Sequence, residues 1–433
     1  MKSKWFTPSA ISLALVSLFS TATVQASPLD KELRAVEDKV IEWRRDLHQN
    51  PELSNREFKT ANKVAKHLKA LGLEVETGIA YTGVAGFLKG AKPGPTVMLR
   101  ADMDALPVTE DNDLPFKSTV TTEYRGVKTG VMHACGHDTH VAMLMGAAEV
   151  LAAKRDELAG NILFVFQPAE EGAPPGEEGG AELMLKQGLF KKYKPDVAFG
   201  LHITSSMYTG TIGYRSGPIM ASADRFEIEV SGKQAHGSRP WSGVDPIVAS
   251  AQIINGVQTI VSRQVNITKE PAVVSFGKIS GGVRNNIIPD KVNLIGTIRN
   301  FDMGIRQQIF EKLKVTAEKI AESQGAVAKV NIFEGYPVTA NNKALMASML
   351  PTIKRAAGKD NVVEMPKITG AEDFSFYALE IPSVFMFLGA TPKGTDLSSV
   401  PSNHSPLVVF EEDAFKVGTA TLSNMAWDYL TAN

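Results

Sequence analysis

The sequence predicts an α/β fold, with a mixed, largely parallel sheet that carries helices on both faces and is interrupted by an inserted α+β module. Three observations predict it. Short apolar runs, each as long as a buried strand, alternate with stretches whose apolar residues recur at helical spacing. From about Ser222 the pattern changes to alternation of apolar and polar residues. From Pro382 the buried-strand pattern returns, which indicates that the alternating region is an insertion.

Two amphipathic helices are expected after the N-terminal region. Their apolar residues are spaced by three and four positions, as one face of a helix requires. The first set is Leu33, Val36, Val40, Trp43 and Leu47, and the second is Phe58, Ala61, Val64, Leu68 and Leu71.

Buried strands are expected next, because apolar runs without polar alternation are typical of strands that are covered on both faces. A helix is expected at residues 141–153. Parallel strands need crossover connections, so this alternation favours a largely parallel sheet. The strand-like runs are residues 84–88, 96–99, 162–166 and 197–201.

The inserted module has the order β-α-β-β-α-β, which is that of a ferredoxin-like fold. Its strands are expected at residues 226–230, 273–279, 292–298 and 327–332, and its helices at 246–261 and 309–320. A strand at 382–388 and a helix at 411–430 then complete the main domain. We therefore assign residues 27–217 and 333–433 to the main domain and residues 218–332 to the module.

Residues 1–26 have the pattern of a secretory signal peptide. Lys2 and Lys4 precede the apolar stretch 11–19, and Val24-Gln25-Ala26 has the small residues of a cleavage site. We expect cleavage before Ser27 and a mature chain that is exported, periplasmic or secreted, and not held in a membrane. An uncleaved anchor is the alternative, which the short apolar stretch disfavours because a span needs about 20 residues.

The charge balance and the cysteine content exclude some classes of protein. The chain has 46 Lys and Arg against 47 Asp and Glu, so no overall positive charge attracts nucleic acid. Its one cysteine, Cys135, has no partner for a disulfide within the chain. An exported protein with a single cysteine needs another explanation for it.

That explanation is suggested by the segment from His133 to His140, which holds three imidazoles, a thiol and a carboxylate. It lies directly before the predicted helix at 141–153. Divalent transition metals prefer imidazole, thiolate and carboxylate ligands, and Cys135 and His137 can reach one ion from a strand-to-helix turn. The alternative is that these polar groups cap the helix and that the cysteine is buried and inert.

Two adjacent carboxylates, Glu170 and Glu171, directly follow another predicted strand. Ligands of open α/β sheets bind beyond the carboxyl ends of the strands. One carboxylate can hold a metal ion while the other moves a proton, which metal-assisted hydrolysis requires. Taken alone, such a pair is more often solvated surface.

Three further positions complete the candidate set. His202 follows the predicted strand at 197–201, and His404 precedes the last helix. Asp102 and Asp104 end the strand at 96–99 and share a face of extended chain, so they can support the same site. A lone loop histidine is more often structural than a ligand.

Six motifs together resemble those of the M20 metallopeptidase and amidohydrolase family, in the branch of hippurate hydrolases, N-acyl-amino-acid amidohydrolases and IAA-amino-acid hydrolases. The resemblance runs from about Val36 to Leu430 and implies a fold of the di-metal peptidase type. The motifs lie at residues 100–107 (RADMDALP), 133–138 (HACGHD), 167–172 (QPAEEG), 210–217 (GTIGYRSG), 370–374 (GAEDF) and 403–406 (NHSP).

The resemblance also implies roles for individual residues. Glu170 would be the general base, and Asp104 would orient a histidine that binds metal. Manganese and zinc are both candidates, because the thiolate stands where the wider clan has an aspartate. Five residues would hold two divalent ions, with the thiolate between them: Cys135, His137, Glu171, His202 and His404.

For the inserted module, the resemblance implies a lid and dimerisation domain, and hence a homodimer or higher homo-oligomer. His236 would stabilise the oxyanion, and Asn285 would contact a substrate carboxylate. From residue chemistry alone, His236 is about as well explained as a solvated turn residue. The loop at 172–180 is longer than in many relatives, which suggests that it shapes the rim of the pocket.

The expected reaction is metal-dependent hydrolysis of the amide bond in N-acyl-amino acids, such as benzoyl-, acetyl- or indoleacetyl-amino acids. A dipeptidase or carboxypeptidase that acts on short peptides is the first alternative, because it would use the same metals and base. A non-catalytic exported binding protein is the second. Glu170 distinguishes the second from an enzyme, since a binding protein has no use for a free carboxylate beside the metals.

Overall fold

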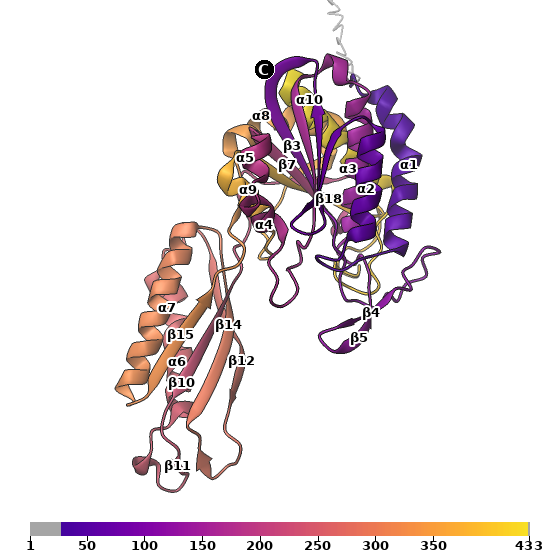
Figure 1. The fold of residues 1–433 in the computed structure, drawn as a ribbon. Coiled ribbons are helices and arrows are strands. Elements are labelled where there is room, and N and C mark those ends of the chain that lie inside the picture. Colours follow the sequence, from indigo (N-terminus) through magenta and orange to yellow (C-terminus); the bar gives the residue numbers. More distant parts are fainter. Residues whose placement is uncertain (1–26, 432–433) are drawn as a thin grey trace, which may run out of the picture.

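An eight-stranded sheet forms the centre of the main domain in the computed structural model, which describes residues 27–431 (Figure 1). Its strands follow the order β1-β2-β6-β3-β7-β18-β8-β17. Their bounds are β1 Glu74–Ile79, β2 Gly83–Lys89, β3 Lys92–Asp102, β6 Ala159–Gln167, β7 Val197–Tyr208, β8 Ile212–Tyr214, β17 Val362–Glu364 and β18 Ser383–Thr391.

The centre of this sheet is parallel. Strand β3 pairs in parallel with β6 and β7, and β18 pairs in parallel with β7. The antiparallel pairs β1–β2, β2–β6 and β18–β8 lie on either side of it. The register places Asp102 opposite Gln167 and His202 opposite Phe387, so the polar ends of several strands meet at one edge.

Helices cover both faces of the sheet, as predicted, because alternate residues of each strand point to opposite sides. Val97 and Leu99 of β3 belong to the core beneath one set of helices, whereas Met98 belongs to a second core. Helices α1 (Asp30–Gln49), α2 (Phe58–Ala70), α3 (His137–Ala152), α8 (Lys343–Ala357) and α10 (Asp413–Thr431) pack on the first core. Helices α4 (Gly180–Lys186), α5 (Leu189–Tyr193) and α9 (Ser375–Glu380) pack on the second.

Helix α3 begins four residues earlier than the sequence pattern indicated, at His137 instead of Val141. Gly136 precedes it with φ of 93°, in the left-handed region that glycine adopts without strain. A side chain at Gly136 would place its Cβ 2.4 Å from a methyl carbon of Ile203. The tight turn therefore places His137 and His140 in the first turn of the helix, directly over the edge of the sheet.

The inserted module extends away from the main domain (Figure 1). Its sheet has the order β12-β14-β10-β15, and all pairs are antiparallel. Two helices pack against one face of this sheet and leave the other face open. The elements are β10 Asp224–Ser231, α6 Pro246–Thr259, β12 Ala272–Gly281, β14 Lys291–Asn300, α7 Met303–Ser323 and β15 Val327–Phe333.

Three smaller two-stranded sheets complete the structure. Strands β11 (Ala235–His236) and β13 (Ile287–Ile288) pair at the far end of the module (Figure 1). Strands β9 (Gly217–Met220) and β16 (Thr339–Asn341) pair near the junction of module and main domain. Strands β4 (Thr121–Tyr124) and β5 (Val127–Gly130) form a hairpin that projects from the main domain (Figure 1). The sequence pattern did not predict this hairpin, because its strands lack an apolar face.

The predicted signal peptide, residues 1–26, lies outside the described residues. Among residues 27–431, no helix combines the length and the apolar character needed to cross a membrane.

Candidate metal centre

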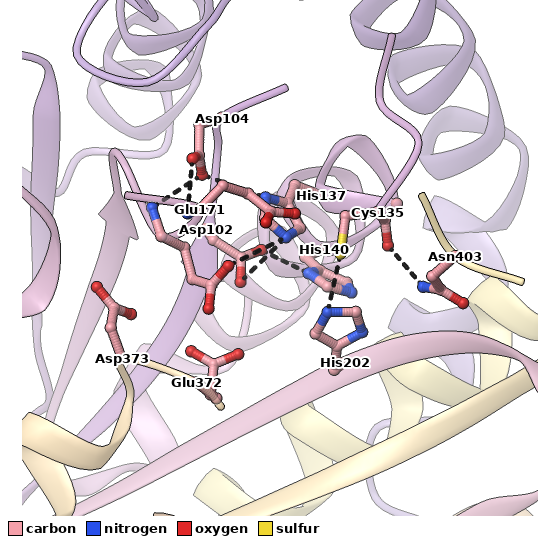
Figure 2. A network of polar contacts seen from close by, with 12 residues as sticks. Asp102, Asp104, Cys135, His137, His140, Glu171, His202, Glu372, Asp373 and Asn403 are labelled. Carbon is pink, nitrogen blue, oxygen red and sulfur yellow. Dashed lines mark hydrogen bonds and ion pairs between the residues drawn. The ribbon is translucent and has the colours of Figure 1, made fainter. Parts of the chain in front are cut away.

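Cys135 lies in the buried turn before α3, with its thiol between two imidazoles. Its Sγ atom is 3.3 Å from Nε2 of His202 and 3.2 Å from Nε2 of His404 (Figure 2 shows the first of these contacts). Asn403 donates hydrogen bonds to the carbonyl oxygens of Cys135 (3.0 Å) and Ile203 (3.1 Å). This amide joins three segments that are distant in sequence, and the sequence analysis had assigned no role to it.

A sharp turn after β6 brings the carboxylates of Glu170 and Glu171 close to His137. Ala169 has φ of 53°, which reverses the chain directly after the strand. The carboxylate of Asp104 then accepts hydrogen bonds from the backbone N–H groups of Glu170 (3.1 Å) and Glu171 (3.0 Å). The side chain of Glu171 lies 3.1 Å from Nε2 of His404.

Asp104 also orients His137, as the sequence analysis proposed. Its Oδ1 atom is 3.2 Å from Nδ1 of His137 (Figure 2). The other ring nitrogen, Nε2, is buried and has no hydrogen-bond partner among the described residues. A buried polar atom without a partner is costly, and a histidine whose second nitrogen is held by a carboxylate is a common arrangement around metal ions.

The ligand atoms fit two divalent metal ions. In each of two groups they lie within 4.8 Å of one another, and Cys135 belongs to both. Burial raises the pKa of the Cys135 thiol well above its ordinary value, and the charges of Glu171 and Glu170 raise it further. A cation at this position would reverse that effect and provide the thiolate ligand. The groups are Cys135, His137 and His202, and Cys135, Glu171 and His404.

We expect Cys135→Ser to lower metal content and activity together, because a serine hydroxyl is a poor replacement for a thiolate. Loss of a supporting contact already costs about 10–100-fold in metal affinity, so a direct ligand should cost at least about tenfold. Mass spectrometry of dialysed protein measures the metal. Ala134→Ser is the matched control, since it adds a hydroxyl to the same buried turn without removing a ligand. Unchanged metal content in Cys135→Ser would show that the thiol is structural.

A buried charge network around Arg100 lies next to the candidate centre, and no pattern in the sequence predicted it. The guanidinium of Arg100 contacts Asp102 (2.5 Å), Glu372 (2.9 Å) and Asp373 (2.8 Å). Asp102 in turn lies 2.5 Å from Nδ1 of His140, whose Nε2 accepts the backbone N–H of Ile203 at 2.7 Å. Arg100 thus connects the strand ends to the segment beside His202. Glu372 and Asp373 belong to a motif whose role the sequence alone did not indicate.

A cavity of about 500 Å³ opens on the candidate centre between the main domain and the module. Arg299 reaches it from β14, and its side chain forms no ion pair or hydrogen bond within residues 27–431. Tyr336 also lines it and donates a hydrogen bond of 2.6 Å to the carbonyl oxygen of Glu170. The side chains of Met220, Ile368 and Phe387 form an apolar part of the cavity wall. Neither Arg299 nor Tyr336 belongs to a sequence pattern that indicated a site.

His236 and Asn285 do not lie at this centre within one chain. His236 is exposed in β11 at the far end of the module, where its Nδ1 atom accepts the backbone N–H of Ser238 at 3.1 Å. Asn285 is exposed just before β13, the strand that pairs with β11. Their assigned roles would require a partner subunit or a movement of the module, and they stay predictions.

The chain is similar to known proteins over nearly all of its length. A sequence model of Peptidase family M20/M25/M40 matches residues 98–428. Thermostable carboxypeptidase 2 of Saccharolobus solfataricus is 41% identical over 392 residues, which are 90% of this chain and 95% of the relative. N-acetylcysteine deacetylase of Bacillus subtilis is 36% identical over 394 residues, which are 91% and 97% of the two chains.

A solved structure shares the fold. The Bacillus subtilis YXEP protein, described as a dinuclear metal-binding peptidase from the M20 family, superposes with a TM-score of 0.76 at 35% identity. The match covers 92% of this chain and all of the other.

Proposed function

Because the chain belongs to Peptidase family M20/M25/M40 and is a metal-dependent hydrolase, we propose that it hydrolyses the amide bond of N-acyl-amino acids. The products are a carboxylic acid and a free amino acid. One observation carries this proposal: a single cavity contains candidate metal ligands, the carboxylate of Glu170 and the guanidinium of Arg299, which is unpaired within residues 27–431. N-acetylcysteine deacetylase, a relative of similar length, acts on an N-acyl-amino acid by its name.

Two divalent ions, manganese or zinc, would be held by the five residues at the candidate centre. When bound, such ions polarise a carbonyl oxygen and make water more acidic. The thiolate and imidazole ligands favour zinc or another borderline-soft metal. Reconstitution of metal-free protein with each ion separately, followed by activity measurements, tests the identity.

Glu170 is the proposed general base. Burial raises the pKa of its carboxyl well above the ordinary value, and the negative charges of Glu372 and Glu171 raise it further. Cations bound beside it would lower this pKa again, which leaves a carboxylate that can accept a proton from the attacking water and deliver one to the leaving nitrogen. The backbone of Glu170 is held on both sides: its N–H donates to the carboxylate of Asp104, and its carbonyl oxygen accepts from the Tyr336 hydroxyl.

Arg299 is the proposed partner of the substrate's carboxylate. We expect Arg299→Ala to lower kcat/KM by about 10–100-fold, because a charge-assisted hydrogen bond contributes about 1.5–3 kcal/mol. The effect should fall on substrates with a free carboxylate and disappear when that group is an amide. Arg225→Ala is the control, since Arg225 is exposed and pairs with Glu227 in the same sheet. Equal losses on carboxylate and amide substrates would contradict this role.

A substrate panel decides between acylase and peptidase. The 41% identity to a carboxypeptidase supports cleavage of short peptides as the second candidate. Metal-reconstituted protein would be offered benzoyl-, acetyl- and indoleacetyl-amino acids beside dipeptides that have the same C-terminal residue. We expect the N-acyl-amino acids to give the higher kcat/KM. Preference for dipeptides would refute the proposal.

We also propose that the chain forms a homodimer or higher homo-oligomer through the module. Exposed apolar side chains support this: Trp241 is 81% exposed, Val283 93% and Ile279 56%. Ile279 lies on β12, an edge strand with unpaired backbone groups. Light scattering measures the mass, and a monomer at micromolar concentration would contradict the proposal.

Export with cleavage before Ser27 is a further proposal, based on the signal-peptide pattern of residues 1–26. N-terminal sequencing of protein from the periplasmic or secreted fraction tests it. A chain that retains residues 1–26 would contradict it.

A further inference from the structure

Glu372 is a buried carboxylate in the lining of the cavity that opens on the candidate centre. Its carboxylate points toward the candidate ligands (Figure 2), and the carboxylates of Glu372 and Glu170 have oxygens within 4.8 Å of each other. Arg299 lines the same cavity, whereas a second cavity of about 410 Å³, which also reaches Glu171, contains neither Glu372 nor Arg299. Glu372 therefore lies on the side of the centre where the proposed function places the amino-acid part of the substrate.

One oxygen of the Glu372 carboxylate is held by two donors, and the other is free. Oε1 accepts hydrogen bonds from Nη2 of Arg100 (2.9 Å) and from the backbone N–H of Phe374 (2.9 Å). Oε2 forms no hydrogen bond within residues 27–431. The side chain is only 1% exposed, and a polar atom in such a place gains more from a partner than it would in water. Oε2 is thus a fixed acceptor that is available to a donor in the cavity.

Asp373, the next residue, differs in this respect. Its carboxylate is similarly buried and also pairs with Arg100, at 2.8 Å. Both of its oxygens accept hydrogen bonds from Nε2 of Gln167 (2.8 and 2.7 Å), and Oδ2 also accepts the backbone N–H of Ala181 (2.8 Å). Among the described residues, Asp373 is not part of the cavity lining. The two acids share the Arg100 network, but only Glu372 has an oxygen left for a ligand.

The leaving nitrogen of an amide substrate supplies a donor at this place. Its lone pair must receive a proton when the C–N bond breaks, and Glu170 is the proposed source of that proton. Its N–H points in another direction and needs an acceptor, because a polar group without a partner is costly where water is excluded. Two carboxylate oxygens within 4.8 Å of each other can both lie about 3 Å from one nitrogen between them. A negative charge at this position also stabilises the ammonium group as it forms.

We propose that Glu372 is a further catalytic residue, which accepts a hydrogen bond from the N–H of the scissile amide and stabilises the departing amine. The inference rests on the proposed function. Burial raises the pKa of Glu372 to about 8, and the guanidinium of Arg100 opposes this rise. Bound cations would lower the pKa and favour the carboxylate. The proposed contact distinguishes amides from esters, because an ester has an oxygen where the amide has its N–H.

Glu372→Gln tests the proposal with almost no change in shape. Arg100 and the Phe374 N–H are both donors, so the new side chain should place its carbonyl oxygen at the position of Oε1 and its NH₂ group at that of Oε2. The free acceptor thereby becomes a donor. Asp373→Asn is the matched control, since it removes one negative charge from the same network outside the cavity lining. Each protein is assayed with an N-acyl-amino acid and with the ester analogue in which oxygen replaces the N–H.

We expect Glu372→Gln to lower kcat/KM for the amide by about tenfold or more relative to the ester, the usual effect of losing one hydrogen bond to a charged group. Asp373→Asn should leave the ratio of amide to ester activity as in wild type, even where it lowers both activities. Metal content, measured by mass spectrometry, should be unchanged in Glu372→Gln. Equal losses on both substrates in Glu372→Gln, or the same change of ratio in both variants, would overturn the inference.

Inhibition by the product gives a second measurement, which does not depend on ester cleavage. The free amino acid presents an ammonium group to Glu372, and the corresponding 2-hydroxy acid does not. We expect Glu372→Gln to weaken inhibition by the amino acid by about tenfold and to leave inhibition by the 2-hydroxy acid unchanged. Equal changes for the two inhibitors would contradict the proposed contact.

The outcome is separable from that of the proposed function. If the wild-type protein cleaves only dipeptides, the proposed function fails. The peptide bond of a dipeptide also has an N–H, so Glu372→Gln should still lower its cleavage relative to that of the depsipeptide, the analogue with an ester bond. An unchanged ratio would overturn the inference in that case too.

Discussion

Glu170→Gln is expected to lower kcat by roughly three orders of magnitude, which is within the range that positioned general bases contribute. Glutamine keeps the shape of the side chain but cannot accept the proton of the attacking water. Metal binding should persist, because the five proposed ligands remain. Steady-state kinetics and mass spectrometry of the same preparation measure both quantities.

Glu178→Gln is the control for this experiment. Glu178 lies in the loop that follows Glu171, and its ion pair with Lys186 is exposed, so its removal should leave kcat unchanged. Full activity in Glu170→Gln would refute the proposed mechanism. A wild-type protein that binds N-acyl-amino acids without cleaving them would support a binding protein instead.

Arg100→Met is expected to lower the free energy of unfolding by about 3–5 kcal/mol, the usual effect of removing one partner from a buried ionic group. Methionine fills much of the space but leaves the carboxylates of Asp102, Glu372 and Asp373 without their cation. All four side chains are at most 2% exposed, so water cannot replace the guanidinium at low cost. Urea unfolding, followed by circular dichroism, measures the change.

Arg56→Met is the matched control for Arg100. Arg56 forms its ion pair with Glu177 at the surface, where its side chain is 51% exposed. Such a pair contributes about 0–1 kcal/mol. If Arg100→Met changed the unfolding free energy no more than this control, the buried network would not stabilise the fold around the candidate centre, and the interpretation of its geometry would be wrong.

Local sequence signals predicted the α/β architecture and pointed to most residues of the candidate centre, whereas the roles of those residues came from the resemblance to a known family. Apolar runs of strand length identify buried parallel strands, and polar residues that directly follow them lie at a common edge of the sheet. Glu171 directly follows β6 and is placed by this rule, and His137 follows a glycine turn. His202 was expected directly after a strand that ends at residue 201, but β7 continues to Tyr208, so His202 lies within the strand. Each signal occupies only a few neighbouring residues, so it can be read without knowledge of the rest of the chain.

Other features depend on contacts between distant segments and were decided only by the tertiary structure. Arg100 and Asp373 are 273 positions apart, and nothing in either segment indicates that they meet. Arg299 resembles any polar strand residue until the module is placed over the cavity. The hairpin β4–β5 has no apolar face, so its polar sequence predicted a loop.

The candidate centre, too, depends partly on local sequence and partly on contacts between distant segments. The local sequence determined which side chains could bind metal or move a proton, because this ability depends on the residue type. The ends of strands can also be recognised from the residues around them. The tertiary structure decided which of them converge, that His236 and Asn285 stand apart within one chain, and that two cavities meet at Glu171. Convergence depends on how sheets, loops and module pack, and no short stretch of sequence contains that information.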